Sequence, residues 1–402
     1  MKVLYIHQYF VTPDEHGTSR SYWFAKKLIE EGFQVTMITS TNEYKHKKPE
    51  IIDIEGIHVI YLKNEYSQYF SKIRKVYSFV TFVVRAIRQA LKEKNVDLVF
   101  ATSTPLTVGF IALVLKRIRK WKFVFEVRDL WPEFPIQVGA IKNSLLIRIL
   151  RKLEKTIYQK AEHVIALSPG MAEGVLNCGI PENKVTIITN MSKGDLFYPR
   201  VQTDEQFLKY GIDKAKFNVA HVGAMGVANG LDSVVQTAHF LQEERRDDLI
   251  NFIIAGDGAT LPSLKQQVEN WRLGNVKFIG EYNTYETSEI LNCCDMSLVS
   301  FKNLPILYTN SPNKLFDSLS AGKPIIVNSA GWTKRLVEDF DCGFYVNPEE
   351  PGDLADKLLM ISKDSEKLEE YARNSRKVSL EKFDKSILTC KFVSVINSVL
   401  HV

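Results

Sequence analysis

The sequence has few cysteines and no long apolar run, and these two absences exclude several classes of protein. Its five cysteines are scattered, without a CxxC pair or the cysteine–histidine spacing that binds zinc. A disulfide framework is therefore not expected, and the compartment should be a reducing cytoplasm. Because no run of about 18 apolar residues occurs, we expect no membrane-spanning helix. The opening residues MKVLYIHQYF lack the apolar region of a signal peptide and predict a first β-strand.

Several signatures of nucleotide chemistry and catalysis are also missing. There is no GxxxxGK[ST] phosphate loop, no GxSxG nucleophile turn and no DxD carboxylate pair after a predicted strand. No cluster of metal ligands stands out either. We therefore expect neither a metal ion nor a cofactor.

The charge of the chain is distributed unevenly between its two halves. The 402 residues suffice for two domains, and the formal net charge is +5. Residues 1–200 hold 30 basic and 19 acidic residues, whereas residues 201–402 hold 22 and 28. A basic first half and an acidic second half predict two domains with different partners, unless the difference is only drift of surface charge.

Short apolar strands alternate with amphipathic helices along the whole chain. In the first half, strands are predicted at 2–10, 34–40, 58–62, 98–103, 122–127, 163–168 and 185–190. After a polar stretch the pattern restarts, with strands predicted at 217–223, 251–258, 275–280, 296–300, 323–328 and 342–347. This alternation is typical of parallel sheets with helices on both faces.

The predicted fold class is therefore α/β, with two facing Rossmann-like doubly wound domains and a cleft between them. We predict an N-terminal domain over 1–195 and a C-terminal domain over 205–380, joined by a linker around 190–205. A long polar helix is predicted at 353–381, and a last helix, within 381–402, is expected to pack back on the N-terminal domain. Ligands of such sheets bind beyond the carboxyl ends of the strands.

The segment SPNKLFDSLSAGKP (311–324) reads as a helix that begins at a phosphate. Ser311 is a suitable N-cap, and the exposed amides of a helix start attract an anion. Lys314 adds a positive charge there, and Asp317, just under one turn on, offers a carboxylate to sugar hydroxyls. These residues predict a nucleotide-sugar site, although ordinary helix capping explains them equally well when they are taken alone.

Small-residue turns follow the strands of the second half. Close approach of the backbone to a phosphate or sugar is one use of such turns, and a tight strand–helix connection is the other. An aromatic side chain after the strand at 275–280 has room to pack near a base. The residues predicted to bind the donor are Gly223, Ala224, Gly256, Gly280, Tyr282, Ser311, Asn313, Lys314 and Asp317.

Two segments of the first half are candidates for acceptor binding and catalysis. The loop HQYFVTPDEHGTSR (7–20) is unusually long, and long loops after a strand are often functional. The segment EVRDLWPE (126–133) carries charges directly after a buried strand, where carboxylates can orient a hydroxyl or form a buried ion pair. We predict catalytic roles for Asp129, Glu126 and Lys314, and acceptor contacts for Gly17, Thr18, Arg20, Ser103 and Arg128.

Basic and apolar residues are mixed in two stretches of the first half, 71–94 and 115–122. A basic amphipathic helix can lie on an anionic membrane surface, although a core-facing helix with a basic edge gives the same pattern. Nucleic acid is not an expected partner, because no nucleic-acid-binding module accompanies the charge.

Taken together, VRDLWPE (127–133) and the segment 311–324 resemble the retaining glycosyltransferases of family 4, which have the GT-B fold. More narrowly they are similar to the WbuB-like enzymes of bacterial O-antigen and capsule synthesis. The resemblance implies transfer of a sugar, often an N-acetylated amino-deoxysugar, from a UDP-linked nucleotide-diphosphate donor to a lipid-linked glycan. It also implies a cytoplasmic enzyme, peripheral on the inner face of the plasma membrane.

The chain departs from the family pattern at two places. Relatives carry two acids near the start of this helix, whereas here Thr309 holds the first position and Asp317 the second. Many relatives also place arginine and lysine after the glycine turn, but this chain reads GAMGVANG (223–230), which leaves Lys314 as the candidate for the diphosphate. Asp129 follows a strand where many relatives carry a histidine.

Two alternatives to a transferase stay open at this point. A nucleotide-sugar 2-epimerase has the same fold and needs no acceptor. A non-catalytic partner that only binds a nucleotide sugar fits the loss of the first acid at Thr309.

Overall fold

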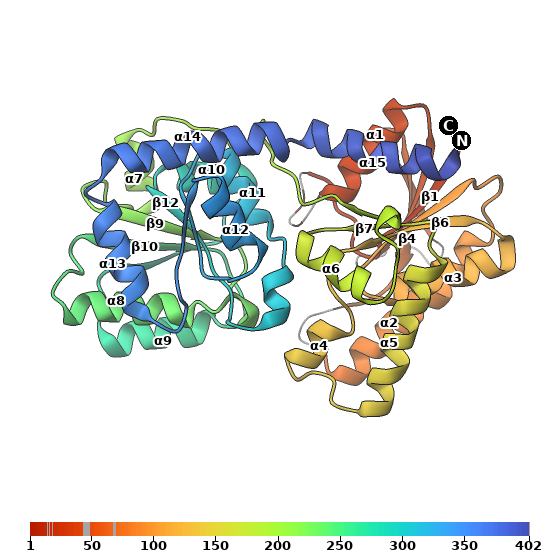
Figure 1. Cartoon of the computed structure of the whole chain (residues 1–402), viewed down its shortest axis with the longest axis horizontal. Coiled ribbons are helices and arrows are strands. Elements are labelled where there is room, and N and C mark those ends of the chain that lie inside the picture. Colours follow the sequence, from red (N-terminus) through yellow and green to blue (C-terminus); the bar gives the residue numbers. More distant parts are fainter. Residues whose placement is uncertain (14, 16, 18, 43–48, 67–69, 402) are drawn as a thin grey trace. The chain divides into compact units, whose positions relative to one another are not determined.

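The computed structural model describes residues 1–13, 15, 17, 19–42, 49–66 and 70–401 (Figure 1). The chain divides into two compact units. Unit 1 comprises residues 1–189 and 386–402, and unit 2 comprises residues 190–385. Each unit is described separately below.

Unit 1 is built on an eight-stranded sheet with the order β3-β4-β2-β1-β5-β6-β7-β8. All neighbours pair in parallel except β3, which is antiparallel to β4. The sequence pattern did not predict β3, a short edge strand. The strands are β1 (Lys2–Ile6), β2 (Gln34–Thr41), β3 (Glu50–Ile54), β4 (Ile57–Lys63), β5 (Leu98–Thr102), β6 (Lys122–Val127), β7 (His163–Ala166) and β8 (Val185–Ile187).

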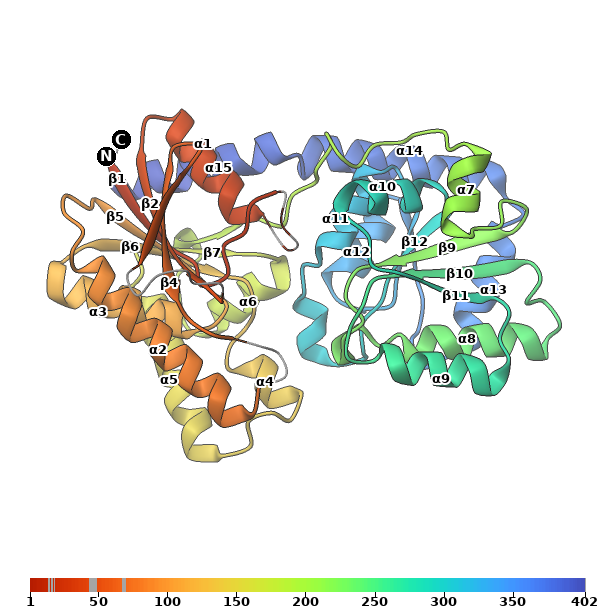
Figure 2. The same ribbon diagram turned by 180° about the vertical axis from the view of Figure 1, so that it is seen from behind.

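Helices cover both faces of this sheet (Figures 1 and 2). Helices α2 and α3 pack against each other on one face, and α3 also contacts α5. The helices are α1 (Arg20–Glu30), α2 (Lys72–Ala90), α3 (Thr107–Arg119), α4 (Glu133–Gln137), α5 (Ser144–Lys160), α6 (Pro169–Asn177), the short 3₁₀ turn η1 (Glu182–Lys184) and α15 (Lys385–Leu400).

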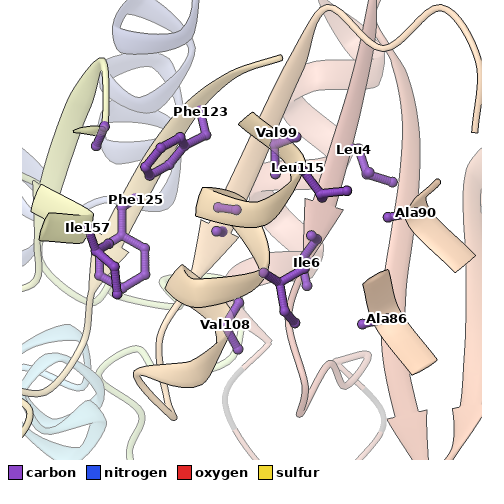
Figure 3. Close-up of a cluster of buried hydrophobic side chains, with 14 of the residues drawn as sticks. Leu4, Ile6, Ala86, Ala90, Val99, Val108, Leu115, Phe123, Phe125 and Ile157 are labelled. Carbon is purple, nitrogen blue, oxygen red and sulfur yellow. The ribbon is translucent and has the colours of Figure 1, made fainter. Parts of the chain in front are cut away.

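The core of unit 1 lies on both sides of the sheet. On one side, apolar side chains of β1, β5 and β6 meet those of α2, α3 and α5 (Figure 3). On the other side, the ring of Phe392 from α15 stacks on Phe24 of α1 with centroids 4.1 Å apart. Phe392 also lies 4.8 Å from the ring of Phe100 on β5. Helix α15 is thus part of the unit 1 core, although unit 2 precedes it in the sequence.

Unit 2 contains a six-stranded sheet with the order β11-β10-β9-β12-β13-β14, and all of its neighbours pair in parallel. Its strands are β9 (Phe217–Val222), β10 (Ile250–Ala255), β11 (Val276–Gly280), β12 (Met296–Val299), β13 (Ile325–Val327) and β14 (Gly343–Tyr345). Each of them lies inside a predicted segment, except β10, which begins one residue before its segment. The strands carry continuous apolar runs because both faces of the sheet are covered.

Helices α8 and α9 lie on one face of this sheet and α10 and α11 on the other (Figures 1 and 2). The helical segments are α7 (Asp204–Tyr210), η2 (Val227–Asn229), α8 (Asp232–Glu243), α9 (Leu261–Trp271), α10 (Thr284–Asn292), η3 (Pro305–Thr309), α11 (Asn313–Ser320), α12 (Trp332–Asp339), α13 (Pro351–Ile361) and α14 (Ser365–Lys382). The single helix predicted at 353–381 is wrong, because Asp364 caps α14 by accepting from the backbone N–H of Lys367.

The predicted α/β class with two Rossmann-like parallel sheets is confirmed. The segment predicted as a linker, 190–205, packs with unit 2 from Asn190 on. Ser192 there forms an isolated bridge with Asp384, and Phe197 is buried. In the part of the chain that the structure describes, no helix is long and apolar enough to cross a membrane. The same residues contain no group of three or more metal-ligating side chains.

Candidate functional site

In unit 2, Lys314 near the start of α11 reaches the turn that follows β9. Its ammonium Nζ lies 2.9 Å from Nε2 of His221 on β9. A Cβ atom added to Gly223 would lie 3.8 Å from the same Nζ. Gly223 and Ala224 are exposed, whereas the lysine itself is half-buried. Lys314 therefore borders an accessible stretch of backbone at the carboxyl end of the sheet.

The hydrogen bonds of His221 fix which ring nitrogen carries the proton. Its Nδ1 lies 3.2 Å from the carbonyl oxygen of Leu298, which can only accept, so Nδ1 carries the hydrogen. Nε2 then has a free lone pair and accepts from the Lys314 ammonium. Burial, followed by the positive charge of Lys314, holds the pKa of His221 well below its usual value and keeps the ring neutral.

Lys314 is a cation without a carboxylate partner among the described residues. Burial lowers its pKa to about 7. Lys323, just after α11, is also half-buried but donates to the carbonyl oxygens of Cys294, at 2.8 Å, and Asn292, at 3.3 Å. Lys323 thus hydrogen-bonds to the backbone of the unit, whereas Lys314, when protonated, can hold an anion.

The predicted N-cap at Ser311 is wrong. Helix α11 begins at Asn313, and its N-cap is Pro312, whose side chain cannot accept a hydrogen bond. The Ser311 hydroxyl is buried without a hydrogen-bond partner among the described residues, and its carbonyl oxygen accepts from Asn190 Nδ2 at 2.6 Å. The side chain of the N-cap residue does not hydrogen-bond to the amides at the start of α11. The positive end of this helix and Lys314 therefore both favour a negatively charged ligand.

The turns after β9, β10 and β11 are joined through their backbones. The N–H of Gly223 donates to Ala255 at 2.8 Å, and the N–H of Gly256 donates to Gly280 at 2.7 Å. Gly256 has φ +137°, and a Cβ atom there would lie 2.0 Å from the carbonyl oxygen of Gly223. The structure thus requires Gly256 for packing between turns, which is a different role from the predicted donor contact. Gly280 is exposed at the end of β11.

Asp317 lies one turn into α11 with its carboxylate mostly buried. Its nearest cation is Lys193, whose Nζ is 4.0 Å from Oδ1. Burial raises the pKa of the Asp317 carboxyl, and Lys193 partly offsets this effect. The other predicted donor residue with a large side chain, Tyr282, packs edge-on against Tyr210 with ring centroids 5.2 Å apart. The Tyr282 ring is thus already in contact with an aromatic neighbour.

In unit 1, a polar cluster lies at the carboxyl ends of the neighbouring strands β1, β5 and β6. His7 Nε2 lies 3.2 Å from Nη1 of Arg128, and His7 Nδ1 lies 2.9 Å from the hydroxyl of Ser21. The guanidinium can only donate, so Nε2 accepts and Nδ1 donates to Ser21. Burial lowers the pKa of His7, and Arg128 lowers it further. Sequence reasoning missed His7, although its place directly after a strand was a usable signal.

Two hydroxyls from the turn after β5 hold the backbone of Arg128 and the carboxylate of Asp129. The N–H of Arg128 donates to the hydroxyl of Ser103 at 2.9 Å. The hydroxyl of Thr104 donates to Asp129 Oδ2 at 2.8 Å. Burial raises the pKa of the Asp129 carboxyl, and the hydrogen bond from Thr104 and the charge of Arg128 oppose this shift. The structure thus brings together three of the predicted residues, Ser103, Arg128 and Asp129.

Arg20 and Glu126 form a buried ion pair instead of contributing to this cluster. Arg20 Nε lies 2.9 Å from Glu126 Oε1, and both side chains are almost fully buried. The guanidinium also donates to the carbonyl oxygens of Ile188 and Thr189. These hydrogen bonds join α1 to the last residues of the segment 1–189. The structure thus gives Glu126 and Arg20 a buried partner each, and their predicted catalytic and acceptor-binding roles stay predictions. Gly17 is exposed, and Thr18 lies outside the described residues.

Two family descriptions match consecutive parts of the chain. Residues 17–191 match the Glycosyl transferase 4-like domain, and residues 202–378 match Glycosyl transferases group 1. The chain belongs to the GT-B glycosyltransferases. This glycosyltransferase is 22% identical over 273 residues to the probable glycosyltransferase WbjE of Pseudomonas aeruginosa, covering 67% of each chain. It is also 22% identical over 312 residues to the N,N'-diacetylbacillosaminyl-diphospho-undecaprenol alpha-1,3-N-acetylgalactosaminyltransferase of Campylobacter jejuni, covering 76% of this chain and 79% of the relative.

Solved structures of glycosyltransferases share the fold of this enzyme. Sucrose-phosphate synthase from Thermosynechococcus elongatus superposes with a TM-score of 0.80 at 15% identity, covering 100% of this chain and 99% of that one. HepE from Anabaena, solved in complex with UDP, gives a TM-score of 0.72 at 17% identity, covering 99% and 100%. At these identities the likeness concerns the fold alone.

Proposed function

We propose that this glycosyltransferase moves a sugar from a nucleotide-diphosphate donor to a lipid-linked glycan, with retention of configuration. The observation that carries the proposal is the setting of Lys314. Lys314 is half-buried, its ammonium has only the neutral His221 as a hydrogen-bond partner among the described residues, and it lies beside the exposed backbone of Gly223. A site with positive charge and no internal counter-charge suits the diphosphate of a nucleotide sugar.

In the proposed mechanism, Lys314 and the start of α11 hold the donor diphosphate. As the bond to the sugar breaks, negative charge develops on the leaving phosphate, and fixed positive groups stabilise it without a metal ion. Asp317, one turn further along the helix, contacts the ribose or the sugar. Uridine is the proposed base, because the similar HepE was solved with UDP.

The cluster of His7, Arg128 and Asp129 in unit 1 is proposed to receive the acceptor. Asp129 orients the attacking hydroxyl, and Arg128 offers donors to a negatively charged part of the acceptor. The leaving phosphate of the donor accepts the proton of that hydroxyl, so no separate strong base is needed. Asp129 thus acts by positioning, and Lys314 by stabilising charge.

The proposed setting is surface-polysaccharide synthesis, such as O-antigen or capsule, at the inner face of the plasma membrane. Support comes from the Campylobacter relative, whose name specifies an undecaprenol-linked acceptor and an N-acetylated aminosugar. Unit 1 contains most of the basic first half of the chain, which suits an anionic membrane surface. Binding to anionic vesicles should fall with added salt, since surface charges are screened, and salt-insensitive or absent binding would contradict this part of the proposal.

A thermal-shift panel of nucleotide sugars tests the donor site, because a ligand that binds the folded state raises its stability. Lys314→Ala should weaken binding of the stabilising donor by about 1.5–3 kcal/mol, the range for a hydrogen bond to a charged group. The matched control is Lys265→Ala, which removes an exposed lysine on α9. Equal donor affinity in both variants would remove Lys314 from the site.

Transfer itself separates the proposal from its two alternatives, neither of which the relatives' names favour. Incubation with the donor alone should leave the sugar unchanged, whereas accumulation of a free epimer would indicate a 2-epimerase. Addition of a lipid extract that contains acceptors should yield a glycosylated lipid. Donor binding without transfer to any lipid extract would favour a non-catalytic binding partner.

A further inference from the structure

Unit 1 contains a cavity of about 280 Å³ where β4 ends and α2 begins. It is separate from the residues to which the proposed reaction assigns a role. Its floor is fixed by hydrogen bonds: Asn64 donates to the hydroxyl of Ser78 at 3.0 Å, and that hydroxyl donates to the carbonyl oxygen of Glu65 at 2.8 Å. The lining residues are Lys63, Asn64, Glu65, Phe70, Arg74, Tyr77, Ser78, Thr81 and Arg85.

Among the described residues, three cations and one carboxylate line this cavity, which gives it a positive charge. Arg74 stacks on the ring of Phe70 at 3.8 Å and lies 3.4 Å from the Glu65 carboxylate. Arg85 donates to the backbone carbonyl of Lys63, which uses part of its guanidinium. No carboxylate of the described residues lies within 4.0 Å of the charged groups of Lys63 or Arg85. An anion can therefore be held by several donors at once.

The helix that forms one wall of the cavity also exposes an apolar stripe. Ile73 is 83% exposed and Tyr77 is 72% exposed, and the other members of the stripe are Val76, Val80 and Val84. Positions 73, 77, 80 and 84 follow the spacing of one helix face. The opposite face of α2 supplies Phe82 and Ala86 to the core, so the exposed stripe is additional to the buried one.

The arginines of the cavity stand directly beside this stripe. Arg74 and Arg85 are three turns apart on α2, and Tyr77 belongs to both the stripe and the cavity wall. An apolar face next to a cationic pocket matches the boundary of a bilayer, where acyl chains meet phosphate groups. A soluble anion would use the pocket but would leave the apolar stripe in water.

We propose that this cavity binds the phosphate of an anionic membrane lipid while the exposed stripe of α2 enters the bilayer interface. The inference deepens the membrane part of the proposed function by assigning it to a defined site. Lys63, Arg74 and Arg85 hold the phosphate, and Ile73, Val76 and Tyr77 contact the acyl chains. A zwitterionic headgroup binds less well, because its ammonium group repels the three cations of the pocket.

Vesicle sedimentation of the full chain tests the site. Binding should be stronger on phosphatidylcholine vesicles that contain phosphatidylglycerol than on phosphatidylcholine alone. The double variant Arg74→Gln/Arg85→Gln should lower the partition coefficient on the anionic vesicles by about tenfold or more, since each cation near such a surface contributes on the order of 1 kcal/mol. Where that variant melts at a lower temperature than the native chain, Lys63→Gln/Arg74→Gln takes its place.

A matched control distinguishes the pocket from diffuse attraction. Arg88→Gln/Lys92→Gln removes the same charge from exposed positions at the end of α2 and just beyond it, outside the cavity. The control should lose clearly less binding than the pocket variant. Equal losses in the two variants would overturn the proposal, because they would indicate non-specific electrostatics.

The apolar stripe has its own test and control. Ile73→Ser/Val76→Ser should weaken vesicle binding, whereas Val201→Ser/Leu208→Ser, which changes exposed residues of unit 2, should not. If the stripe variant binds vesicles as the native chain does, the stripe does not enter the bilayer. If glycerol 3-phosphate occupies the pocket while no vesicle sediments the protein, the pocket serves a soluble phosphate and the proposal is wrong.

Donor binding, measured without vesicles, separates the failure of this inference from that of the proposed function. If the protein binds vesicles through the pocket but no nucleotide sugar of the thermal-shift panel stabilises it, the donor proposal alone is contradicted. If the donor binds, and the pocket and stripe variants both bind vesicles as the native chain does, the lipid site alone is contradicted.

Discussion

The setting of Lys314 predicts that donor binding takes up a proton. In the free enzyme the pKa of Lys314 is about 7, so half of its side chains are neutral at that pH. A diphosphate that accepts hydrogen bonds from the ammonium stabilises it by about 1.5–3 kcal/mol. Since 1.36 kcal/mol corresponds to one pKa unit, the pKa of Lys314 in the complex should be about 8–9.

The sign and size of the pH dependence follow from these two values. Above pH 7 the free enzyme must bind a proton before Lys314 can hold the diphosphate, so donor affinity falls as the pH rises and levels off above the pKa of the complex. The total loss between pH 6 and pH 10 should be about 10–150-fold. At pH 7.5 each bound donor should carry about 0.6–0.7 proton into the complex. His221 stays neutral over this range, because its pKa lies well below its usual value.

Isothermal titration calorimetry in two buffers with different ionisation enthalpies measures this proton uptake directly. Both phosphates of a nucleotide sugar are esterified, and titration of the same donor against Lys314→Met corrects for any ionisation of the ligand. The variant should show no uptake, and its affinity should equal the high-pH limit of the native enzyme. Affinity that is independent of pH between 6 and 9, or equal proton uptake in the variant, would refute the reasoning.

Three further predictions concern other parts of the two units. Asp129→Asn should slow transfer to the acceptor by about 100-fold, because a misplaced reactant reacts more slowly. The donor affinity measured by calorimetry should stay unchanged, and a drop in it would contradict an acceptor role. Glu126→Gln should lower the free energy of unfolding in urea by about 3–5 kcal/mol, because it leaves Arg20 charged and buried. A native-like midpoint of urea unfolding would show that stability does not depend on the Arg20–Glu126 pair. Gly256→Ala should lower the melting temperature, with an overpacking penalty of about 1–3 kcal/mol from the contact with Gly223. An unchanged melting temperature would show that the packing between the turns does not require glycine.

The fold was largely predictable because parallel strands buried on both faces leave apolar runs with clear ends. The strand predicted at 122–127 matches β6 at both boundaries. Strand β3 (Glu50–Ile54) was not predicted, because it is a half-exposed edge strand without a continuous apolar run. The break between α13 and α14 was readable in principle, since Asp364 is a good N-cap, but the polar residues on either side continue a helical pattern.

The candidate site was only partly predictable, because its decisive contacts join residues far apart in the sequence. Lys314 stood out from its place at a helix start, but its pairing with His221, 93 residues away, is fixed by the sheet. Likewise the pairing of Arg20 with Glu126 spans 106 residues and uses charges that looked available for an acceptor. Local patterns indicate where charged groups gather; only tertiary structure decides which of them neutralise one another.

The placement of α15 in unit 1 has a consequence for the order in which the protein matures on the ribosome. Phe392 completes the aromatic stack on Phe24 and Phe100, yet it is synthesised only after every strand of unit 2. Domains generally fold as they emerge, so unit 2 can reach its native state first. The amino-terminal unit must wait in an unfinished form, with one face of its sheet covered by α1 but not yet by α15. Chaperone dependence should therefore be concentrated in the half of the protein that is translated first.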